Sequence, residues 1–438
     1  MTAIVAPPVT RERLPSGLTV LVAHRPGVPL VAVRLLVRAG SSLDPAGRFG
    51  LASLTASAIR RGTRDHSGPA LDALVEALGA ELGAGVDEDA ASVGFSAPLE
   101  ALSQLLGVLA EVASRPAFPL GEVERLRRRE LAGLLHDLDE AGIVADRALI
   151  GAAYGDHPYG HPSEGRRRHL AAIRRRDLAE FHARHWRPSR ATLVLVGPVD
   201  PATTLALVRR RFAGWRGEPV GDVVVGRPAP PPAGVLLVDA PEVSQAQLRI
   251  AAAGQPRSSP DHAAGVVAGA AVGGSFTSRL MEAIRVERGL SYGVRARFAS
   301  GRAGGLFLVS SFTKVETAGE LVQVALDELQ RFAEGGPTDE ELERTRGYLA
   351  GLHPLSLETH EAWCDKLGEV ELYGLGSDEV SGFLARVDAV DARACQAVVG
   401  RALAGGRRAV VAVGPAKKLR PQLERFGPVR VVTARSVM

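Results

Sequence analysis

The chain contains an internal repeat. The run GLTVLV at residues 17–22 is echoed by GVLLV at residues 234–238, and TLVLVGP at residues 192–198 is echoed by AVVAVGP at residues 409–415. Both echoes are displaced by 217 positions, one near the start and one near the end of each repeat. An equal displacement at two distant places indicates that the chain holds two copies of one folding unit.

A proline-rich segment separates the two copies. Residues 228–234 read PAPPPAG, which neither a helix nor the interior of a sheet accommodates. We therefore expect an N-terminal domain at residues 1–218, a stiff, extended linker at residues 219–234 and a C-terminal domain at residues 235–438. A single ordinary core would also be too small for 438 residues.

Apolar periodicity predicts strands first, then long helices, then a short strand. Residues 31–37 have the two-residue period of a half-buried strand. Residues 70–82 and 99–114 have helical spacing, and a helix at residues 176–186 leads into an apolar strand at residues 193–196. This order predicts an α+β fold with two homologous domains, each an antiparallel sheet with helices packed on one face.

Composition and charge argue against several functions. The arginine runs at residues 125–129, 166–168 and 174–176 are interleaved with acidic residues and lack aromatic partners, so we interpret them as solvated helix faces rather than a nucleic-acid site. No stretch reaches about 18 consecutive apolar residues, so no membrane span is expected. Cys364 and Cys395 are too few for a disulfide framework, and residues 1–11 show no secretory signal, so a cytoplasmic location is expected.

Residues 50–63 read GLASLTASAIRRGT. This segment resembles the active-site helix of the insulinase/pitrilysin (M16) metallopeptidases, which reads GLAHxxEH and continues to GT. On that pattern Ser53 and Ser57 stand where the family has two zinc-binding histidines, and Ala56 stands where it has the catalytic glutamate. Hydroxyl groups are poor zinc ligands, and alanine cannot accept a proton.

The third zinc ligand of the family is a glutamate on a later helix. Counted without gaps from Ser57, that position falls on Gly133, with Glu130 three residues away. One carboxylate without the imidazoles does not make a zinc site. The resemblance therefore implies that this chain carries no cofactor of its own.

The resemblance extends over nearly the whole chain. Further matching segments are LPSGLTV at residues 14–20, YGDHPYG at 154–160, FHARHWRP at 181–188, GGSFTSRL at 273–280 and RVERGLSY at 285–292. Together they resemble the short two-domain members, similar to subunits of mitochondrial processing peptidase. The resemblance implies two domains of the LuxS/MPP-like metallohydrolase fold.

One functional pair of the family is present. An arginine and a tyrosine, seven residues apart in the second domain, bind the substrate backbone and stabilise the oxyanion in the family, and they map onto Arg285 and Tyr292. Guanidinium and phenol groups are both hydrogen-bond donors, as that role requires. The alternative is that Arg285 is a surface helix residue and Tyr292 an aromatic residue at the start of a strand.

The resemblance implies a non-catalytic subunit of a heterodimeric zinc peptidase, without activity alone. The partner would supply HxxEH and zinc, while this chain would form half of the chamber around an extended peptide and contribute Arg285 and Tyr292. The alternative is a non-proteolytic peptide-binding or scaffold homologue. The sequence does not indicate which peptide is bound.

Three other motifs have simpler interpretations. GLSYG at residues 289–293 fits the GxSxG pattern of serine hydrolases, but a predicted helix precedes it and a predicted strand follows it, the reverse of the required order. The histidine pairs His157/His161 and His182/His185 lack an evident third ligand and are interpreted as structural. The acidic run at residues 87–89 follows Gly83 and Gly85, which are expected to end a helix, and is interpreted as an exposed turn.

Overall fold

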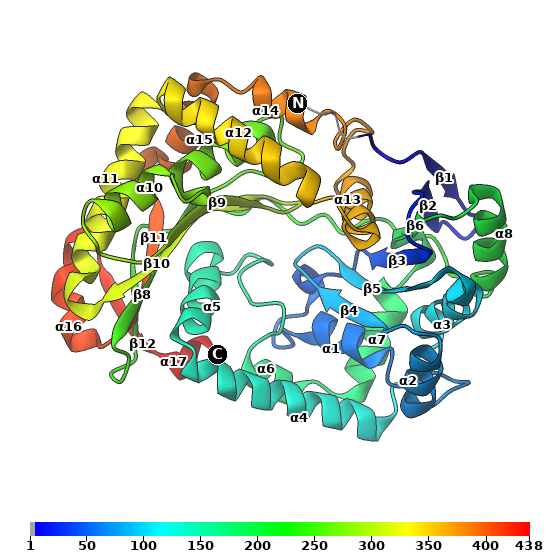
Figure 1. Cartoon of the computed structure of the whole chain (residues 1–438). Helices are drawn as coiled ribbons and strands as arrows, with labels where there is room; N and C mark the ends of the chain where they lie inside the picture. Colours follow the sequence, from blue (N-terminus) through cyan, green and yellow to red (C-terminus); the bar gives the residue numbers. More distant parts are fainter. Residues whose placement is uncertain (1–4) are drawn as a thin grey trace.

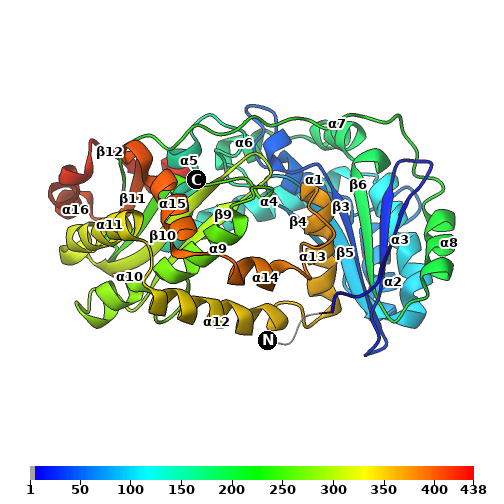
Figure 2. The same cartoon turned by 90° about the horizontal axis from the view of Figure 1, so that it is seen from above.

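The computed structural model describes residues 5–438, which form two six-stranded sheets surrounded by helices (Figure 1). The first sheet has the order β1-β2-β6-β3-β5-β4 and the second β12-β7-β11-β8-β10-β9. The strands are β1 (Val9–Arg13), β2 (Thr19–His24), β3 (Leu30–Val37), β4 (Gly83–Val86), β5 (Ala91–Pro98), β6 (Ala191–Gly197), β7 (Gly234–Asp239), β8 (Gln245–Ala253), β9 (Val294–Ser300), β10 (Gly305–Lys314), β11 (Arg408–Gly414) and β12 (Val429–Thr433). Seen from above, the two sheets stand at opposite ends of the molecule (Figure 2).

The helices follow the predicted order. They are α1 (Leu51–Ala58), α2 (Gly68–Ala77), α3 (Leu102–Ser114), α4 (Leu120–His136), α5 (Ala141–Tyr154), α6 (Arg167–Ala172), α7 (Arg175–His185), α8 (Pro201–Arg211), α9 (His262–Gly269), α10 (Arg279–Met281), α11 (Ala318–Gly335), α12 (Asp339–Leu355), α13 (His360–Tyr373), α14 (Phe383–Asp388), α15 (Ala392–Leu403), α16 (Ala416–Leu423) and α17 (Ala434–Val437). The helix predicted at residues 70–82 ends earlier, at Ala77, because Gly79 adopts a left-handed φ of +69°. None of the helices within residues 5–438 has the length and apolar character needed to cross a bilayer.

The α+β class is confirmed, but the sheets are mixed rather than purely antiparallel. Strand β2 pairs in parallel with β6, and β7 pairs in parallel with β11 and β12. The central strands are buried on both faces, which explains why β6 is a continuous apolar run. Leu193 and Leu195 pack into the core on one face of the first sheet, and Val194 and Val196 into a separate core on the other face.

The second face of each sheet is covered by a helix from the other half of the chain. Helix α5 places Val144 and Leu149 against β7, β8 and β11 of the second sheet. Helix α13 places Trp363 and Leu367 against β2, β3 and β6 of the first sheet. Figure 1 shows both exchanged helices at these positions. The prediction of helices on one face is therefore correct, and the exchange adds a helix on the other.

Helix α13 lies unusually close to the first sheet. A Cβ atom on Gly368 would stand 2.2 Å from Cδ1 of Leu36, so a larger residue there would require the Leu36 side chain to move. The Cys364 thiol donates a hydrogen bond to the carbonyl oxygen of Ala32 at 3.2 Å. Burial raises the pKa of the Cys364 and Cys395 thiols, so both are protonated core groups.

The acidic run at residues 87–89 forms a turn, as the sequence suggested, but it follows a strand rather than a helix and is only partly exposed. Gly83 and Gly85 lie in edge strand β4, so residues 87–89 connect β4 to β5. The Asp89 carboxylate accepts hydrogen bonds from the Tyr159 hydroxyl and from the Arg302 backbone N–H at 2.8 Å. This turn of the first half therefore contacts the second half.

The connection between the halves is extended and anchored. Residues 215–233 contain no helix or strand. The Asp222 carboxylate pairs with Arg38 of the first half at 3.3 Å and with Arg302 of the second half at 2.8 Å. His157 contacts the carbonyl oxygen of Gly226 at 2.8 Å. The segment is thus held against both halves along its length.

The helix exchange predicts that the halves stay associated after the linker is cut. Exposing each large side chain under α5 or α13 would cost about 1.5–3 kcal/mol, so separation should be strongly unfavourable. We expect a chain with a protease site inserted after Val224 to elute at the intact 46.0 kDa position after cleavage. Size-exclusion chromatography tests this, and two smaller peaks under native conditions would contradict it.

The buried histidines predict acid sensitivity. His182 contacts the Ala113 carbonyl oxygen at 2.9 Å, and burial lowers the pKa of His182 and His185 from 6.5 to about 4. Between these pH values the unfolded chain binds more protons, so the free energy of unfolding should fall by about 1.4 kcal/mol per pH unit for each histidine as pH drops. Denaturant titrations of the H182Q/H185Q variant should show a shallower slope, with exposed H136Q as the matched control. An unchanged slope in the double variant would refute this.

Candidate functional site

Helix α1, which corresponds to the zinc helix of the resemblance, is fixed at its N-terminus. The Asp44 carboxylate accepts hydrogen bonds from the backbone N–H groups of Gly50 at 2.6 Å and Ala52 at 2.7 Å. Gly50 has φ +97°, and a Cβ there would stand 2.6 Å from the Glu164 carbonyl oxygen. The loop around Gly165 therefore crosses the start of α1 in close contact with it.

The positions that correspond to the family's zinc ligands hold residues that do not bind zinc. Ser53 and Ser57 are half-buried on α1, four residues apart on one face, and Ala56 is buried. Gly133 is exposed on α4, and no atom lies within 4 Å of its would-be Cβ. These residues do not fit a zinc ion, because two hydroxyl groups and a glycine supply neither imidazole nor carboxylate.

Nearby carboxylates do not replace the missing ligands. The Glu130 carboxylate is paired with Arg129 of the same helix at 2.8 Å, and both side chains are partly exposed. Across residues 5–438, no three His, Cys, Asp or Glu side chains gather in a way that could hold a metal ion.

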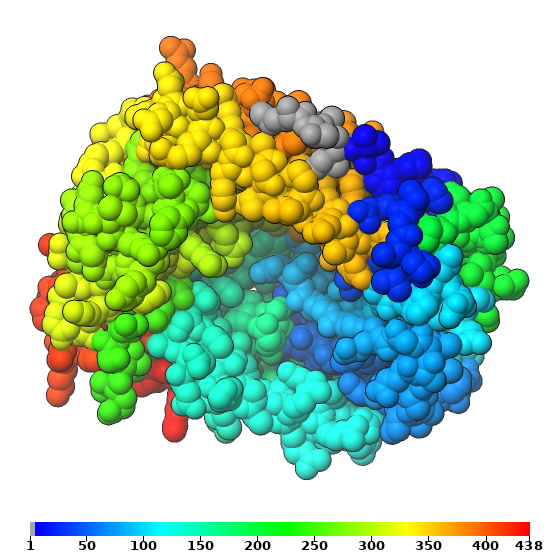
Figure 3. Space-filling model, viewed as in Figure 1, coloured from blue at the N-terminus to red at the C-terminus, as the bar shows by residue number. Residues whose placement is uncertain are grey.

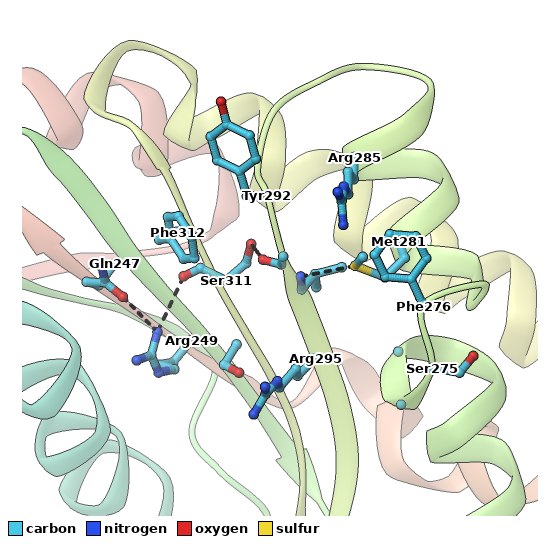
Figure 4. Close-up of a pocket in the computed structure, with 15 residues that line it drawn as sticks. Gln247, Arg249, Ser275, Phe276, Met281, Arg285, Tyr292, Arg295, Ser311 and Phe312 are labelled. Carbon is cyan, nitrogen blue, oxygen red and sulfur yellow. Dashed lines mark hydrogen bonds between the residues drawn. The ribbon is translucent and has the colours of Figure 1, made fainter. Parts of the chain in front are cut away.

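The predicted pair Arg285 and Tyr292 lines one open pocket of about 590 Å³ in the second half. Figure 4 shows both side chains on one side of the pocket, with Arg249 and Arg295 across from them. The pocket is bounded by β8, β9 and β10, by the loop at residues 273–276 and by the segment that carries Arg285. No aspartate or glutamate lines it. Its polar side chains are thus suited to binding carbonyl or carboxylate oxygens.

Two short π-helical segments frame the pocket. The first, η5 (Ala270–Gly274), precedes the loop with Phe276, and the second, η6 (Glu282–Val286), carries Arg285. Such widened turns are rare and are frequent at functional sites. The Arg285 guanidinium lies 4.4 Å from the centroid of the Phe276 ring, a cation–π contact that orients it.

The residues around Tyr292 hold it outward. Ser311 and Ser291 both donate hydrogen bonds to the Gly293 carbonyl oxygen, at 2.8 and 2.9 Å, and so fix the turn into β9. The Tyr292 ring itself is 81% exposed. No carboxylate within residues 5–438 lies within 4 Å of the Arg285 guanidinium. The two donors are therefore free to meet a ligand.

The GxSxG serine is a structural residue. Ser291 is buried, and its hydroxyl also accepts a hydrogen bond from the Gly293 N–H at 3.2 Å. The segment before it is helical and the segment after it is β9, the reverse of a nucleophile elbow. The order of elements therefore agrees with the sequence analysis, which did not assign this motif to a serine hydrolase.

Sequence reasoning missed three side chains of the pocket. Arg249 on β8 is buried and donates hydrogen bonds to the carbonyl oxygens of Ser311 at 3.3 Å and Gly142 at 3.2 Å, which ties the exchanged helix α5 to the pocket wall. Arg295 on β9 and Phe276 are exposed toward the pocket. The sequence signal for Phe276 was that it is an aromatic residue within the polar run SFTS. Arg249 and Arg295 gave no signal, because a single arginine in a strand does not indicate a binding site.

The fold is that of a peptidase scaffold, and the chain belongs to the M16 peptidase family. The family model described as insulinase (peptidase family M16) matches residues 19–165, and the one described as peptidase M16 inactive domain matches residues 172–349.

Among relatives, an uncharacterised zinc protease of Mycobacterium leprae is 28% identical, over 84% of this chain and 83% of that protein. A protein of Helicobacter pylori named a non-peptidase homologue is 24% identical, over 76% of this chain and 77% of its own length. The crystal structure of a peptidase M16 inactive domain from Pseudomonas fluorescens superimposes with a TM-score of 0.87 at 27% identity, covering 93% of this chain and 98% of that one.

The assignment of the ligand positions predicts that zinc binding can be restored. A Ser53→His, Ala56→Glu, Ser57→His, Gly133→Glu variant should bind zinc at least about tenfold more tightly than the natural chain, because it regains two imidazoles and a carboxylate. Zinc uptake after equilibrium dialysis is the measurement, with Ser53→Ala/Ser57→Ala as the control. Equal uptake by all three chains would mean that α1 and α4 are wrongly aligned with the family pattern.

Proposed function

We propose that this chain is the non-catalytic subunit of a heterodimeric M16-type zinc peptidase. In this proposal it forms half of the peptide-binding chamber and has no activity alone. A homologous partner supplies the HxxEH helix and the zinc ion, which activates water when bound there. This chain supplies Arg285 and Tyr292, which bind the peptide carbonyl and stabilise the oxyanion that develops on it.

The observation that carries the proposal is the contrast between the two sites. The α1 site carries none of the imidazole or carboxylate groups that bind the metal or accept a proton in the family pattern, whereas Arg285 and Tyr292 are present and line one pocket without a carboxylate partner among the described residues. An unpaired arginine and a solvent-facing tyrosine contribute little to folding. Their role is better explained by a ligand than by stability.

The shape of the molecule supports a chamber wall. The space-filling view is hollowed at its centre, between segments of the two halves (Figure 3). Strand β9 stands at the edge of the second sheet and begins at the pocket, so an extended peptide could pass Arg285 with its main chain exposed to donors. Because such recognition uses the peptide main chain, it does not depend strongly on the peptide's sequence. The two protonated, unpaired cysteines are in keeping with the cytoplasmic location in this proposal.

A non-proteolytic peptide-binding or scaffold protein is the second candidate. The name of the Helicobacter pylori relative, a non-peptidase homologue, favours it. Both candidates use the same pocket, but only the peptidase subunit requires that Arg285 and Tyr292 affect turnover.

Turnover by the assembled complex distinguishes the two candidates. Co-expression with the HxxEH-bearing chain of the same genome should give chelator-sensitive cleavage of an internally quenched peptide, absent for either chain alone. Arg285→Ala and Tyr292→Phe should each lower kcat by about 100-fold, because each removes a donor to the developing oxyanion.

The matched control is Arg288→Ala. Arg288 lies three residues beyond Arg285, pairs with Glu287 at 2.7 Å and does not line the pocket, so its loss should leave kcat unchanged. Unchanged turnover in the Arg285 and Tyr292 variants would exclude the shared active site and favour the scaffold.

A further inference from the structure

A second pocket, of about 650 Å³, lies at the seam between the halves and is strongly basic. It is lined by five arginines, which are Arg128, Arg166, Arg167, Arg168 and Arg435. Its remaining lining is mostly apolar and includes Leu131 and Leu135 of α4. No acidic side chain lines it. The volume is that of a site for a small molecule.

The five guanidinium groups lack the counter-charges that most arginines of this protein have. Within residues 5–438, none of the five has a carboxylate within 4 Å, although ion pairs are common elsewhere on the molecule. The side chains of Arg167 and Arg435 make no hydrogen bond to any described residue, and the Nε atom of Arg166 is buried without a partner. None of the five guanidinium groups is thus in an ion pair with a described residue, and the pocket concentrates positive charge.

The charges of this cluster act on one of its own members and on a neighbouring histidine. Burial, together with the positive charge of Arg168, lowers the pKa of Arg166. Burial and the charges of Arg168 and Arg166 also lower the pKa of His169. Both groups therefore lie in a positive field.

The pocket is built from both halves of the chain. Arg128 lies on α4 and Arg167 begins α6, whereas Arg435 lies on α17 at the other end of the sequence. The Arg167 N–H donates a hydrogen bond to the Met438 carbonyl oxygen at 2.6 Å, and Met438 is buried in the core of the first half. Figure 1 shows α4, α6 and α17 together along one side of the molecule. A ligand in this pocket would therefore bridge the two halves.

We propose that this pocket binds a small anion with several phosphate groups. Guanidinium groups match phosphate oxygens in bidentate geometry, and a cluster of five calls for a ligand with several closely spaced negative charges. An acidic peptide spreads its carboxylates along a chain, whereas these five arginines line a single pocket of about 650 Å³. The apolar wall of α4 leaves room for an organic group that carries the phosphates.

The proposal revises the sequence interpretation of the run at residues 166–168 as a solvated helix face. That interpretation weighed the run by its sequence neighbours alone. Folding adds Arg128 and Arg435, which are 38 and 269 positions away from Arg166 in sequence, and places no acidic side chain among them.

Calorimetric titration of the full chain with sodium tripolyphosphate tests the proposal. At about 0.15 M NaCl, where long-range attraction is screened, we expect saturable binding of one anion per chain. Arg167→Ala/Arg435→Ala should weaken binding at least about tenfold, and Arg167→Lys/Arg435→Lys should weaken it less, because lysine keeps the charge but loses the bidentate geometry. A parallel titration with ATP shows whether the apolar wall favours phosphates carried on an organic group over free ones.

The matched control is Arg210→Ala/Arg430→Ala, which removes two exposed arginines that lie outside the pocket. It should bind tripolyphosphate as the natural chain does, and all variants should keep the natural melting temperature without ligand. Equal weakening by both alanine pairs, or equal binding of sulfate at matched ionic strength, would overturn the proposal. Tighter binding of polyglutamate than of tripolyphosphate would also overturn it and assign the pocket to an acidic protein segment.

Discussion

Burial of the second face of each sheet is the constraint on which this structure depends. Strands β6 and β11 are apolar on both sides, so neither sheet could stay exposed to water on its inner face. In each half this face is covered by a helix from the other half: α5 covers the second sheet and α13 covers the first. The close approach at Gly368 and the clamp from Arg249 to the start of α5 show how tightly both helices are held.

The packing of α1 does not depend on the residues that correspond to the family's zinc ligands. The helix is held by Leu51, Leu54 and Ala58 in the core and by the Asp44 cap at its N-terminus. None of these contacts involves Ser53 or Ser57, whose side chains face away from the fully buried side. The scaffold and the chemistry of this helix are therefore separable, and the pocket around Arg285 belongs to the other half altogether.

Much of this could be predicted from sequence, for identifiable reasons. The repeat, the α+β class and the position of Arg285 and Tyr292 could be predicted from local runs of residues and from motif spacing, because both can be recognised in one sequence. The exchange of α5 and α13 could not be predicted, because an apolar strand such as residues 193–196 shows that both faces are covered but not by which helix. The element before the turn at residues 87–89 was wrongly predicted as a helix end for a similar reason: Gly83 and Gly85 suit a helix end and an edge strand equally, and only pairing with β5 decides. The roles of Arg249 and Arg435 depend on long-range contacts that leave no sequence pattern.

The exchanged helices also bear on how a peptide could enter a chamber. Because each half packs a helix on the sheet of the other, the halves cannot separate unless that helix leaves the sheet. The ion pairs of Asp222 with Arg38 and Arg302 connect the halves at a second place. The two halves of this chain are thus held together as one unit. In the proposed heterodimer, an opening for a peptide would then form between this chain and its partner, so the rate of entry would be a property of the complex and not of the subunit.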